Sequence, residues 1–193
     1  MTLYKNKYRI ESARCQTWDY TSNGYYFVTI CTHNKQSFFG EIINGEMQLS
    51  KIGQIVAEEW QKTEKIRPNI QLDTWVIMPN HMHSILIINN PVETTHRVVS
   101  DITINQNSPT NDNDINPNKI PRSQSNSLGS IIGQFKSICT KQIWTAGFAE
   151  FKWQTRFHDR IIHDEQSLNH TRKYIINNPA KWESDEHNLV NLP

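Results

Sequence analysis

Residues 74–88 read Thr-Trp-Val-Ile-Met-Pro-Asn-His-Met-His-Ser-Ile-Leu-Ile-Ile. A run this rich in Val, Ile, Leu and Trp predicts a buried β-strand. His81 and His83 are two positions apart, so on a strand both imidazoles project from the same face and could bind one metal ion. The pattern also fits a strand that ends near Pro79, with both histidines as edge residues or as hydrogen-bonded core imidazoles. A metal site therefore needs a third ligand from elsewhere in the chain.

The segments before this stretch predict a strand, a hairpin and a helix. Residues 25–32 are dense in aromatic and β-branched side chains and predict a first, central strand. Residues 37–43 and 46–49 flank Asn44-Gly45, which is a strong signal for a two-residue hairpin turn. From Ile52 to about Ile66, apolar residues spaced by three and four predict an amphipathic helix. Residues 69–72 could then pair with the histidine strand.

The segments after residue 127 predict two helices separated by a strand. Apolar residues recur at near-helical spacing from Leu128 to about Trp144. Residues 153–162 alternate between polar and apolar in the manner of a strand. Asp164 is a suitable N-cap for a last helix that runs to Asn177 and ends before Pro179.

This order of elements predicts an α+β fold. Without the hairpin and the last helix it is the split βαββαβ plan of ferredoxin-like and RRM-like domains, an antiparallel sheet with two helices on one face. In that plan the first and third main strands lie side by side at the centre. His81 and His83 would then project from a central strand, and the final helix would cross the other face.

A chain of 193 residues fits one domain, and its composition suggests where that domain is interrupted. Asn, Ser, Thr, Asp and Pro dominate about residues 89–127, which predicts a disordered or weakly ordered insertion rather than a domain. We therefore expect a basic N-terminal arm at 1–17, a single domain at 18–182 that contains this insertion, and a tail at 183–193.

The charge is distributed unevenly. The formal net charge is only +1, but residues 128–182 hold eight Lys and Arg against four Asp and Glu. The C-terminal third is therefore the part expected to face a polyanion. Three widely spaced cysteines argue against a disulfide framework or a cysteine-based zinc site. With no signal peptide and no long apolar stretch evident, we expect a soluble, cytoplasmic protein that does not enter a membrane.

The last predicted helix offers two further site residues. Tyr174 and Asn178 are four residues apart and so share one helical face. A tyrosine nucleophile and an amide oxygen ligand could be presented together. Each also has an ordinary explanation, since a tyrosine near a helix end often packs in the core and Asn before Pro often ends a helix. Combined with the two histidines, the functional interpretation is favoured.

Several motifs in sequence order carry a family resemblance. They are Pro79 to His83, residues 18–22 with 26–32, residues 129–137, Trp153-Gln154 to Asp159, and Tyr174 to Pro179. Together they resemble the REP-associated tyrosine transposases, within the single-tyrosine HUH (IS200-like) transposases. The resemblance runs from about residue 18 to residue 182, apart from the insertion. His158 departs from it, because the family often has aromatic residues there.

The resemblance implies a chemistry and a set of roles. It implies a metal-dependent endonuclease and strand transferase that acts on single-stranded DNA at or near hairpins, through a 5′-phosphotyrosine intermediate. His81 and His83 match the metal-binding pair, Asn178 a third ligand and Tyr174 the nucleophile. The implied ion is Mg²⁺ or Mn²⁺, although two imidazoles would also suit zinc.

The expected DNA contacts are cationic side chains that would bind phosphates: Lys136, Lys141, Arg156, Arg160, Arg172, Lys173 and Arg14. The sequence leaves open whether the protein is a monomer or a homodimer. Two other functions also remain open. One is a domesticated hairpin-DNA-binding protein with little turnover, and the other is a zinc hydrolase, for which the sequence offers no convincing further ligand.

Overall fold

The computed structural model describes residues 3–4, 7–8, 17–90 and 126–191. Most of the predicted basic arm, including Arg14, most of the predicted insertion and the last two residues of the predicted tail lie outside the described residues. The short strands β1 (Leu3–Tyr4) and β2 (Lys7–Tyr8) form a separate antiparallel pair.

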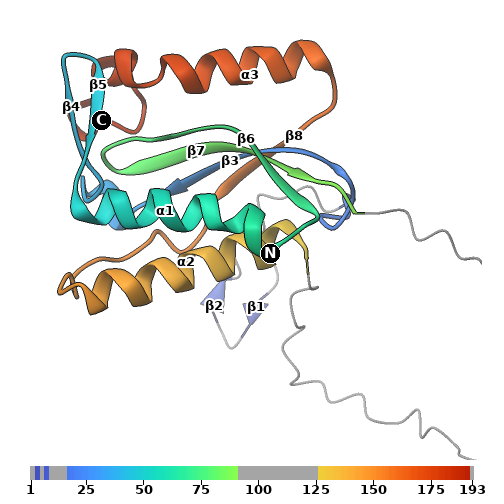
Figure 1. Ribbon diagram of the computed structural model, residues 1–193, viewed down its shortest axis with the longest axis horizontal. Helices are drawn as coiled ribbons and strands as arrows, with labels where there is room; N and C mark the ends of the chain where they lie inside the picture. The colour runs from blue at the N-terminus through green and yellow to red at the C-terminus, as the bar shows by residue number, and fades with distance from the viewer. Residues whose placement is uncertain (1–2, 5–6, 9–16, 91–125, 192–193) are drawn as a thin grey trace, which may run out of the picture.

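One four-stranded antiparallel sheet forms the centre of the fold (Figure 1). Its strands are β3 (Gly24–Cys31), β6 (Ile70–Ile77), β7 (His81–Ile88) and β8 (His158–Ile162), in the order β6-β7-β3-β8. The first and third main strands, β3 and β7, are therefore the central pair. This confirms the predicted split βαββαβ topology.

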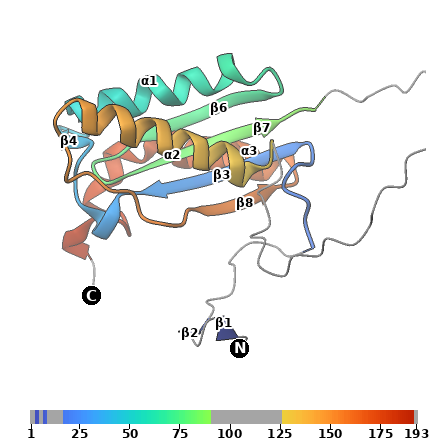
Figure 2. The same cartoon turned by 90° about the horizontal axis from the view of Figure 1, so that it is seen from below.

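Helices cover both faces of this sheet, two on one side and one on the other (Figure 2). The paired helices are α1 (Lys51–Ile66) and α2 (Leu128–Thr145), and α3 (Glu165–Asn177) crosses the opposite face. Alternate residues of β3 explain the division: Tyr26, Val28 and Ile30 join the large core under α1 and α2. Phe27 instead packs with the smaller cluster beside α3.

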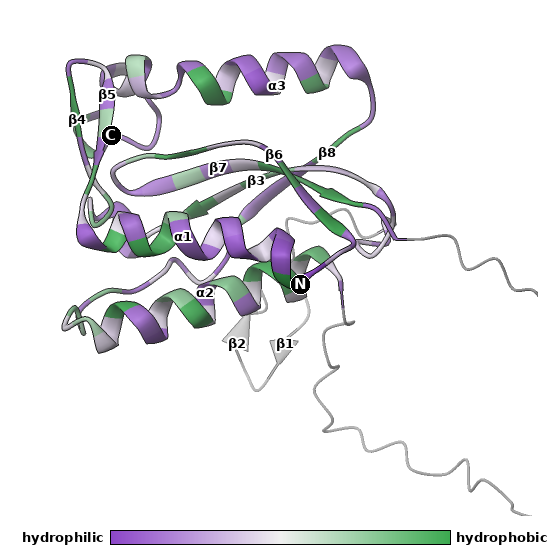
Figure 3. Ribbon diagram, viewed as in Figure 1, coloured by the Kyte–Doolittle hydropathy of each residue, from purple (hydrophilic) through white to green (hydrophobic). Residues whose placement is uncertain are grey.

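Each helix begins at a side-chain cap. Ser50, Ser127 and Asp164 accept hydrogen bonds from the backbone N–H groups of Gly53, Ser130 and Ser167, respectively. Apolar residues gather on the strands and recur along the helices between polar ones (Figure 3). All helices in the described part of the chain are too short or too polar to span a bilayer.

A small hairpin stands beside the start of α1. Its strands are β4 (Gly40–Ile43) and β5 (Glu46–Leu49), joined by Asn44-Gly45 with both φ angles positive at 53° and 78°. Two positive φ angles are those of a type I′ turn, as the Asn-Gly pair predicts. Three short 3₁₀ segments, η1 (His33–Lys35), η2 (Pro179–Ser184) and η3 (Leu189–Asn191), complete the described elements.

The sequence predicts one strand over the apolar run at 74–88, but the structure has two. The chain turns at Met78, Pro79 and Asn80, so that residues 74–77 belong to β6 and the histidines open β7. The Met78 N–H donates to the His81 carbonyl at 2.8 Å and closes the turn. The predicted strand at 153–162 is also shorter, because β8 spans only His158–Ile162, and Trp153 makes an isolated bridge to Thr32.

Candidate active site

His81 and His83 lie side by side at the start of β7, on the face that α3 covers. In the sheet register they pair with Cys31 and Thr29 of β3. Both side chains are buried, and their Nε2 atoms are 3.1 Å apart. Both imidazoles project from one face of a central strand, as the sequence predicts.

Hydrogen bonds from neighbouring residues orient both rings. The Asn80 amide nitrogen donates to the carbonyls of Lys35 and His187 at 2.9 and 2.8 Å. Its Oδ1 therefore accepts from His81 Nδ1 at 2.8 Å, and we infer that His81 Nε2 carries a lone pair. His83 Nδ1 lies 2.8 Å from the Thr29 hydroxyl. Such contacts fix the imidazoles with Nε2 directed into the site.

Tyr174 reaches the same place from α3. Its hydroxyl lies 3.2 Å from His83 Nε2, and its ring packs edge-on against Phe27. The residue is 39% exposed, so part of Tyr174 is open to solvent. The predicted nucleophile and one predicted ligand are therefore in contact, although ninety-one positions separate them.

Two polar contacts hold α3 in this position. Arg172 forms a salt bridge with Asp73 of β6, with a shortest N–O distance of 2.6 Å. Arg160 of β8 donates to the buried Thr171 hydroxyl at 2.8 Å. Leu168 and Ile175 add apolar anchoring against the sheet. The tyrosine helix is thus fixed to both edge strands.

Asn178 follows α3 as its C-cap and is buried, as expected of a ligand. Its amide nitrogen donates to Asp185 Oδ2 at 3.2 Å, while its Oδ1 has no hydrogen-bond partner. A buried carbonyl oxygen without a partner is costly, so an oxygen in this state is suited to a cation.

His187 is a site residue that the sequence did not predict. Its ring centroid lies 4.5 Å from that of His81, and His81, His83 and His187 each offer a nitrogen within 4.8 Å of the others. Its Nδ1 is buried without a hydrogen-bond partner. Asp185 accepts from its backbone N–H at 2.7 Å and so fixes the turn that presents it. The sequence predicts that residues 183–193, which include His187, form a tail.

Burial controls the ionisation of these groups. Burial, reinforced by the nearby His187, lowers the pKa of His83 to about 3. Burial and then His83 lower the pKa of His81 well below its usual range, and burial also lowers that of His187. All three imidazoles are therefore mainly neutral at pH 7, the form that binds metal ions.

The pKa of Tyr174 shifts in the opposite direction to those of the histidines. Burial raises the pKa of Tyr174, and the carboxylates of Asp185 and Glu186 raise it further. A hydrogen bond that the Asn178 amide nitrogen donates to the phenol oxygen has the opposite, smaller effect. The phenol is therefore almost fully protonated at neutral pH and needs help to become a nucleophile.

The donor atoms at this site fit a divalent metal ion. Two nitrogens bound to one ion at about 2.1 Å each are about 3 Å apart when they subtend roughly a right angle, which matches the His81–His83 separation. Asn178 Oδ1 and His187 Nδ1 are the two buried atoms without partners among the described side chains. His187 packs against both histidines, and Asn178 follows Tyr174 by one helical turn, while Tyr174 contacts His83. The residues present therefore fit the implied ion.

The predicted DNA-contacting cations divide between the two faces of the sheet. Lys136 and Lys141 lie on α2, whereas Arg160, Arg172 and Lys173 lie on β8 and α3. Several of these side chains already have protein partners. Lys136 donates to the Gln154 carbonyl at 2.6 Å, while Arg160 and Arg172 hold α3. Arg156 is exposed in the segment before β8, and Arg14 lies outside the described residues.

No family model matches the chain. Among solved structures it is similar to a REP-associated tyrosine transposase bound to a REP hairpin, with 22% identity, a TM-score of 0.47, and coverage of 94% of this chain and 74% of that one. A candidate transposase of Deinococcus radiodurans gives 10% identity, a TM-score of 0.39, and coverage of 87% and 97%.

A closer relative by sequence is an uncharacterized protein of Haemophilus influenzae. The two chains are 34% identical over 178 residues, which span 91% of each. This degree of identity over nearly the full length of both shows common descent. The chain therefore belongs to the same protein family as this Haemophilus influenzae protein.

Proposed function

We propose that this protein is a metal-dependent, single-tyrosine HUH endonuclease and strand transferase of the transposase type, acting on single-stranded DNA at or near hairpins. The observation that carries the proposal is the 3.2 Å contact between the Tyr174 hydroxyl and His83 Nε2. A nucleophile thereby adjoins a pair of neutral, buried imidazoles. The motif resemblance to the REP-associated tyrosine transposases supports the same assignment.

The reaction begins with attack of the Tyr174 oxygen on a DNA phosphorus atom. A bond forms between that oxygen and phosphorus while the bond from phosphorus to the 3′ oxygen breaks. The phenol loses its proton to solvent, and the leaving 3′ oxygen takes up a proton to become a hydroxyl. The 5′-phosphotyrosine keeps the ester's energy, so a second 3′ hydroxyl can reverse the step and join a new strand.

His81 and His83 would hold the metal ion, with Asn178 Oδ1 and His187 Nδ1 as further ligands. When bound, Mg²⁺ or Mn²⁺ supplies a positive charge that polarises the scissile phosphate. Asn80 and Thr29 keep the imidazoles in the orientation that ligation needs. The ring contacts with Phe27 and His83 direct the tyrosine at the same point.

Covalent capture tests this function directly. A labelled single-stranded hairpin oligonucleotide is incubated with the protein and Mn²⁺, and the mixture is denatured and separated by electrophoresis. We expect a protein–DNA adduct that survives denaturation. Tyr174→Phe removes the nucleophilic oxygen but keeps the ring, so it should abolish the adduct.

The control is Tyr25→Phe, because Tyr25 is also an exposed tyrosine on this chain. That variant should form the adduct at the normal rate. An undiminished adduct in Tyr174→Phe would remove Tyr174 as the nucleophile. Tight hairpin binding without any adduct, in excess Mn²⁺, would instead favour a DNA-binding protein with little turnover.

A further inference from the structure

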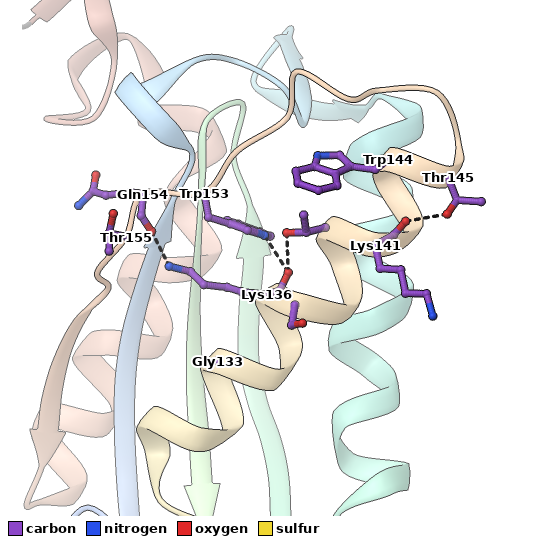
Figure 4. A pocket seen from close by; sticks show the side chains of 10 residues that line it. Gly133, Lys136, Lys141, Trp144, Thr145, Trp153, Gln154 and Thr155 are labelled. Atoms are coloured by element: carbon purple, nitrogen blue, oxygen red, sulfur yellow. Dashed lines mark hydrogen bonds between the residues drawn. The ribbon is translucent and has the colours of Figure 1, made fainter. Parts of the chain in front are cut away.

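A groove of about 800 Å³ lies on the opposite side of the sheet from Tyr174, between α2 and the segment that follows it (Figure 4). The indoles of Trp144 and Trp153 enter it from opposite walls and point toward one another. Lys141 also lines it, one turn from Trp144 on α2, and its side chain extends away from the two indoles (Figure 4). Its lining contains two lysines, several hydroxyl groups and no carboxylate.

Hydrogen bonds fix both walls of this groove. Trp144 Nε1 donates to the Phe151 carbonyl at 3.0 Å, and Trp153 Nε1 donates to the Lys136 carbonyl at 3.2 Å. Lys136 in turn binds the carbonyl of Gln154 and lies over the Trp153 ring, 5.8 Å from its centroid. The indoles are therefore held in place before any ligand arrives.

Trp144 is nevertheless 50% exposed. A half-exposed indole on a helix end is unusual, because burial of an aromatic side chain is strongly favourable. Gly133, another lining residue on α2, has no atom within 4 Å of the position where a Cβ would project. The groove thus combines a flat aromatic surface, free volume and positive charge.

The groove also adjoins the active site around the end of the sheet. Gln154 donates its backbone N–H to the Cys31 carbonyl at 2.9 Å, and Cys31 is the register partner of His81. Gln154 and His81 are therefore about 10 Å apart, two strand spacings. A DNA strand that leaves the Tyr174 face can reach the groove by crossing this end.

We propose that the groove binds an unpaired nucleotide of the single-stranded DNA that flanks the cleavage position, with its base stacked on Trp144 and its phosphate beside Lys141. This inference rests on the proposed function for the choice of DNA. The chemistry itself is that of known single-strand sites, in which an aromatic ring carries the base and a cation carries the backbone.

The test measures binding alone, in EDTA, so that cleavage does not contribute. Fluorescence anisotropy compares a hairpin that has about ten unpaired nucleotides on one end with the same hairpin lacking them. Trp144→Ala should weaken binding of the extended hairpin roughly tenfold and leave the blunt hairpin unaffected. Trp144→Phe keeps an aromatic ring and disturbs folding less, so it should lose less affinity for the extended hairpin.

Lys141→Ala gives an independent measure of the phosphate contact. It should lower affinity for the extended hairpin and reduce the slope of log affinity against log salt by about one. Lys65→Ala, an exposed lysine on the neighbouring helix α1, is the matched control and should change neither. Circular dichroism confirms that each variant is folded.

The outcomes separate this proposal from the proposed function. If Trp144→Ala binds the extended hairpin and the blunt hairpin with the same affinities as wild type, the proposed nucleotide site is overturned, even if the covalent adduct forms. A selective loss in Trp144→Ala would support the groove, even if no adduct forms. If RNA of the same sequence bound as tightly as DNA and showed the same loss, the assignment to DNA would be overturned.

Discussion

His187 illustrates how a single residue can complete a site. Its Nδ1 is buried without a partner, and its ring lies against His81 and His83. If it is a ligand, His187→Ala should weaken Mn²⁺ binding at least tenfold, since even residues that only support ligands contribute this much. Isothermal titration calorimetry on the wild type and the variant measures the difference.

His170→Ala is the control, because His170 is an exposed histidine on α3. It should bind Mn²⁺ with unchanged affinity. An unchanged affinity in His187→Ala as well would leave Asn178 as the third ligand. Stoichiometric, much tighter binding of zinc than of Mn²⁺ would revive the zinc hydrolase interpretation, which the sequence left without a third ligand.

The site was predictable from the sequence only where its residues are close in the chain. His81 and His83 are two apart, and Tyr174 and Asn178 are four apart, so strand and helix periodicity place each pair on one face. His187 follows no such period. It reaches the site because Asp185 and Asn80 hold the turn around it, and tertiary contacts of this kind leave no local pattern.

At the scale of elements, the Arg172–Asp73 salt bridge joins the tyrosine helix to β6. The hydrogen bonds from Arg172 lower the pKa of Asp73. Because the folded pKa is below the unfolded value, the contribution to stability is present above about pH 4 and is lost as the pH falls through the lowered pKa. Asp73→Asn should cost about 1–2 kcal/mol at pH 7 and almost nothing near pH 2.

Urea unfolding at both pH values measures this difference. Glu165→Gln is the matched control, since Glu165 contacts the same arginine at 3.6 Å but is 74% exposed. An exposed pair at that distance contributes little, so its loss should cost less than about 0.5 kcal/mol. An equal effect of Asp73→Asn at both pH values would show that the charge is not responsible.

The β4–β5 hairpin constrains the start of α1 through one glycine. A Cβ atom on Gly53 would overlap the carbonyl oxygen of Phe39, which is backbone and cannot move aside cheaply. Gly53→Ala should therefore destabilise the protein by about 3 kcal/mol or more, although alanine is the better helix former. Thermal unfolding measures the effect.

Gly133→Ala is the counterpart in α2, where nothing lies within 4 Å of the added Cβ. It should be neutral or should raise stability by up to about 1 kcal/mol. A similar loss in both variants would mean that the close approach of Phe39 to α1 is not the cause.

Helices were easier to predict than the turn before β7. Ser50 and Asp164 lie immediately before their helices and act as caps, as such residues usually do. The turn at Met78, Pro79 and Asn80 is fully buried, whereas most turns are exposed and polar. Its carbonyls are satisfied by N–H groups from distant residues, Thr32 and Phe39. The apolar run therefore looked continuous.

At the scale of the whole molecule, the residues that flank segment 91–125 on either side bond to neighbouring parts of the fold. Asn90 bonds Asn69 and the Thr21 carbonyl, while Asn126 accepts from Arg67 and Leu128 bonds the Tyr20 carbonyl. A linker of about eight Gly and Ser residues should span this gap. Because this linker is a shorter loop than the natural segment, it should raise the free energy of unfolding by only about 1 kcal/mol.

Differential scanning calorimetry of the full chain and the shortened chain tests this prediction. A melting temperature equal to or slightly above that of the full chain is expected. A large fall would show that the rest of the fold needs residues 91–125, which would contradict the prediction of a disordered or weakly ordered insertion.

The two faces of the sheet differ greatly in how much apolar surface they bury. Among the described residues, the α1–α2 side contains twenty buried residues in one cluster, whereas α3 shares a cluster of four: Ile85, Ile162, Leu168 and Ile175. Opening of a protein proceeds first through its least-packed unit, which amide hydrogen exchange detects as early exchange. Detachment of α3 would withdraw Tyr174 from the histidines while the sheet stays intact. Heat inactivation would then precede global unfolding. A cross-link that holds α3 against the sheet would delay the inactivation, whereas tighter packing of the α1–α2 core would not.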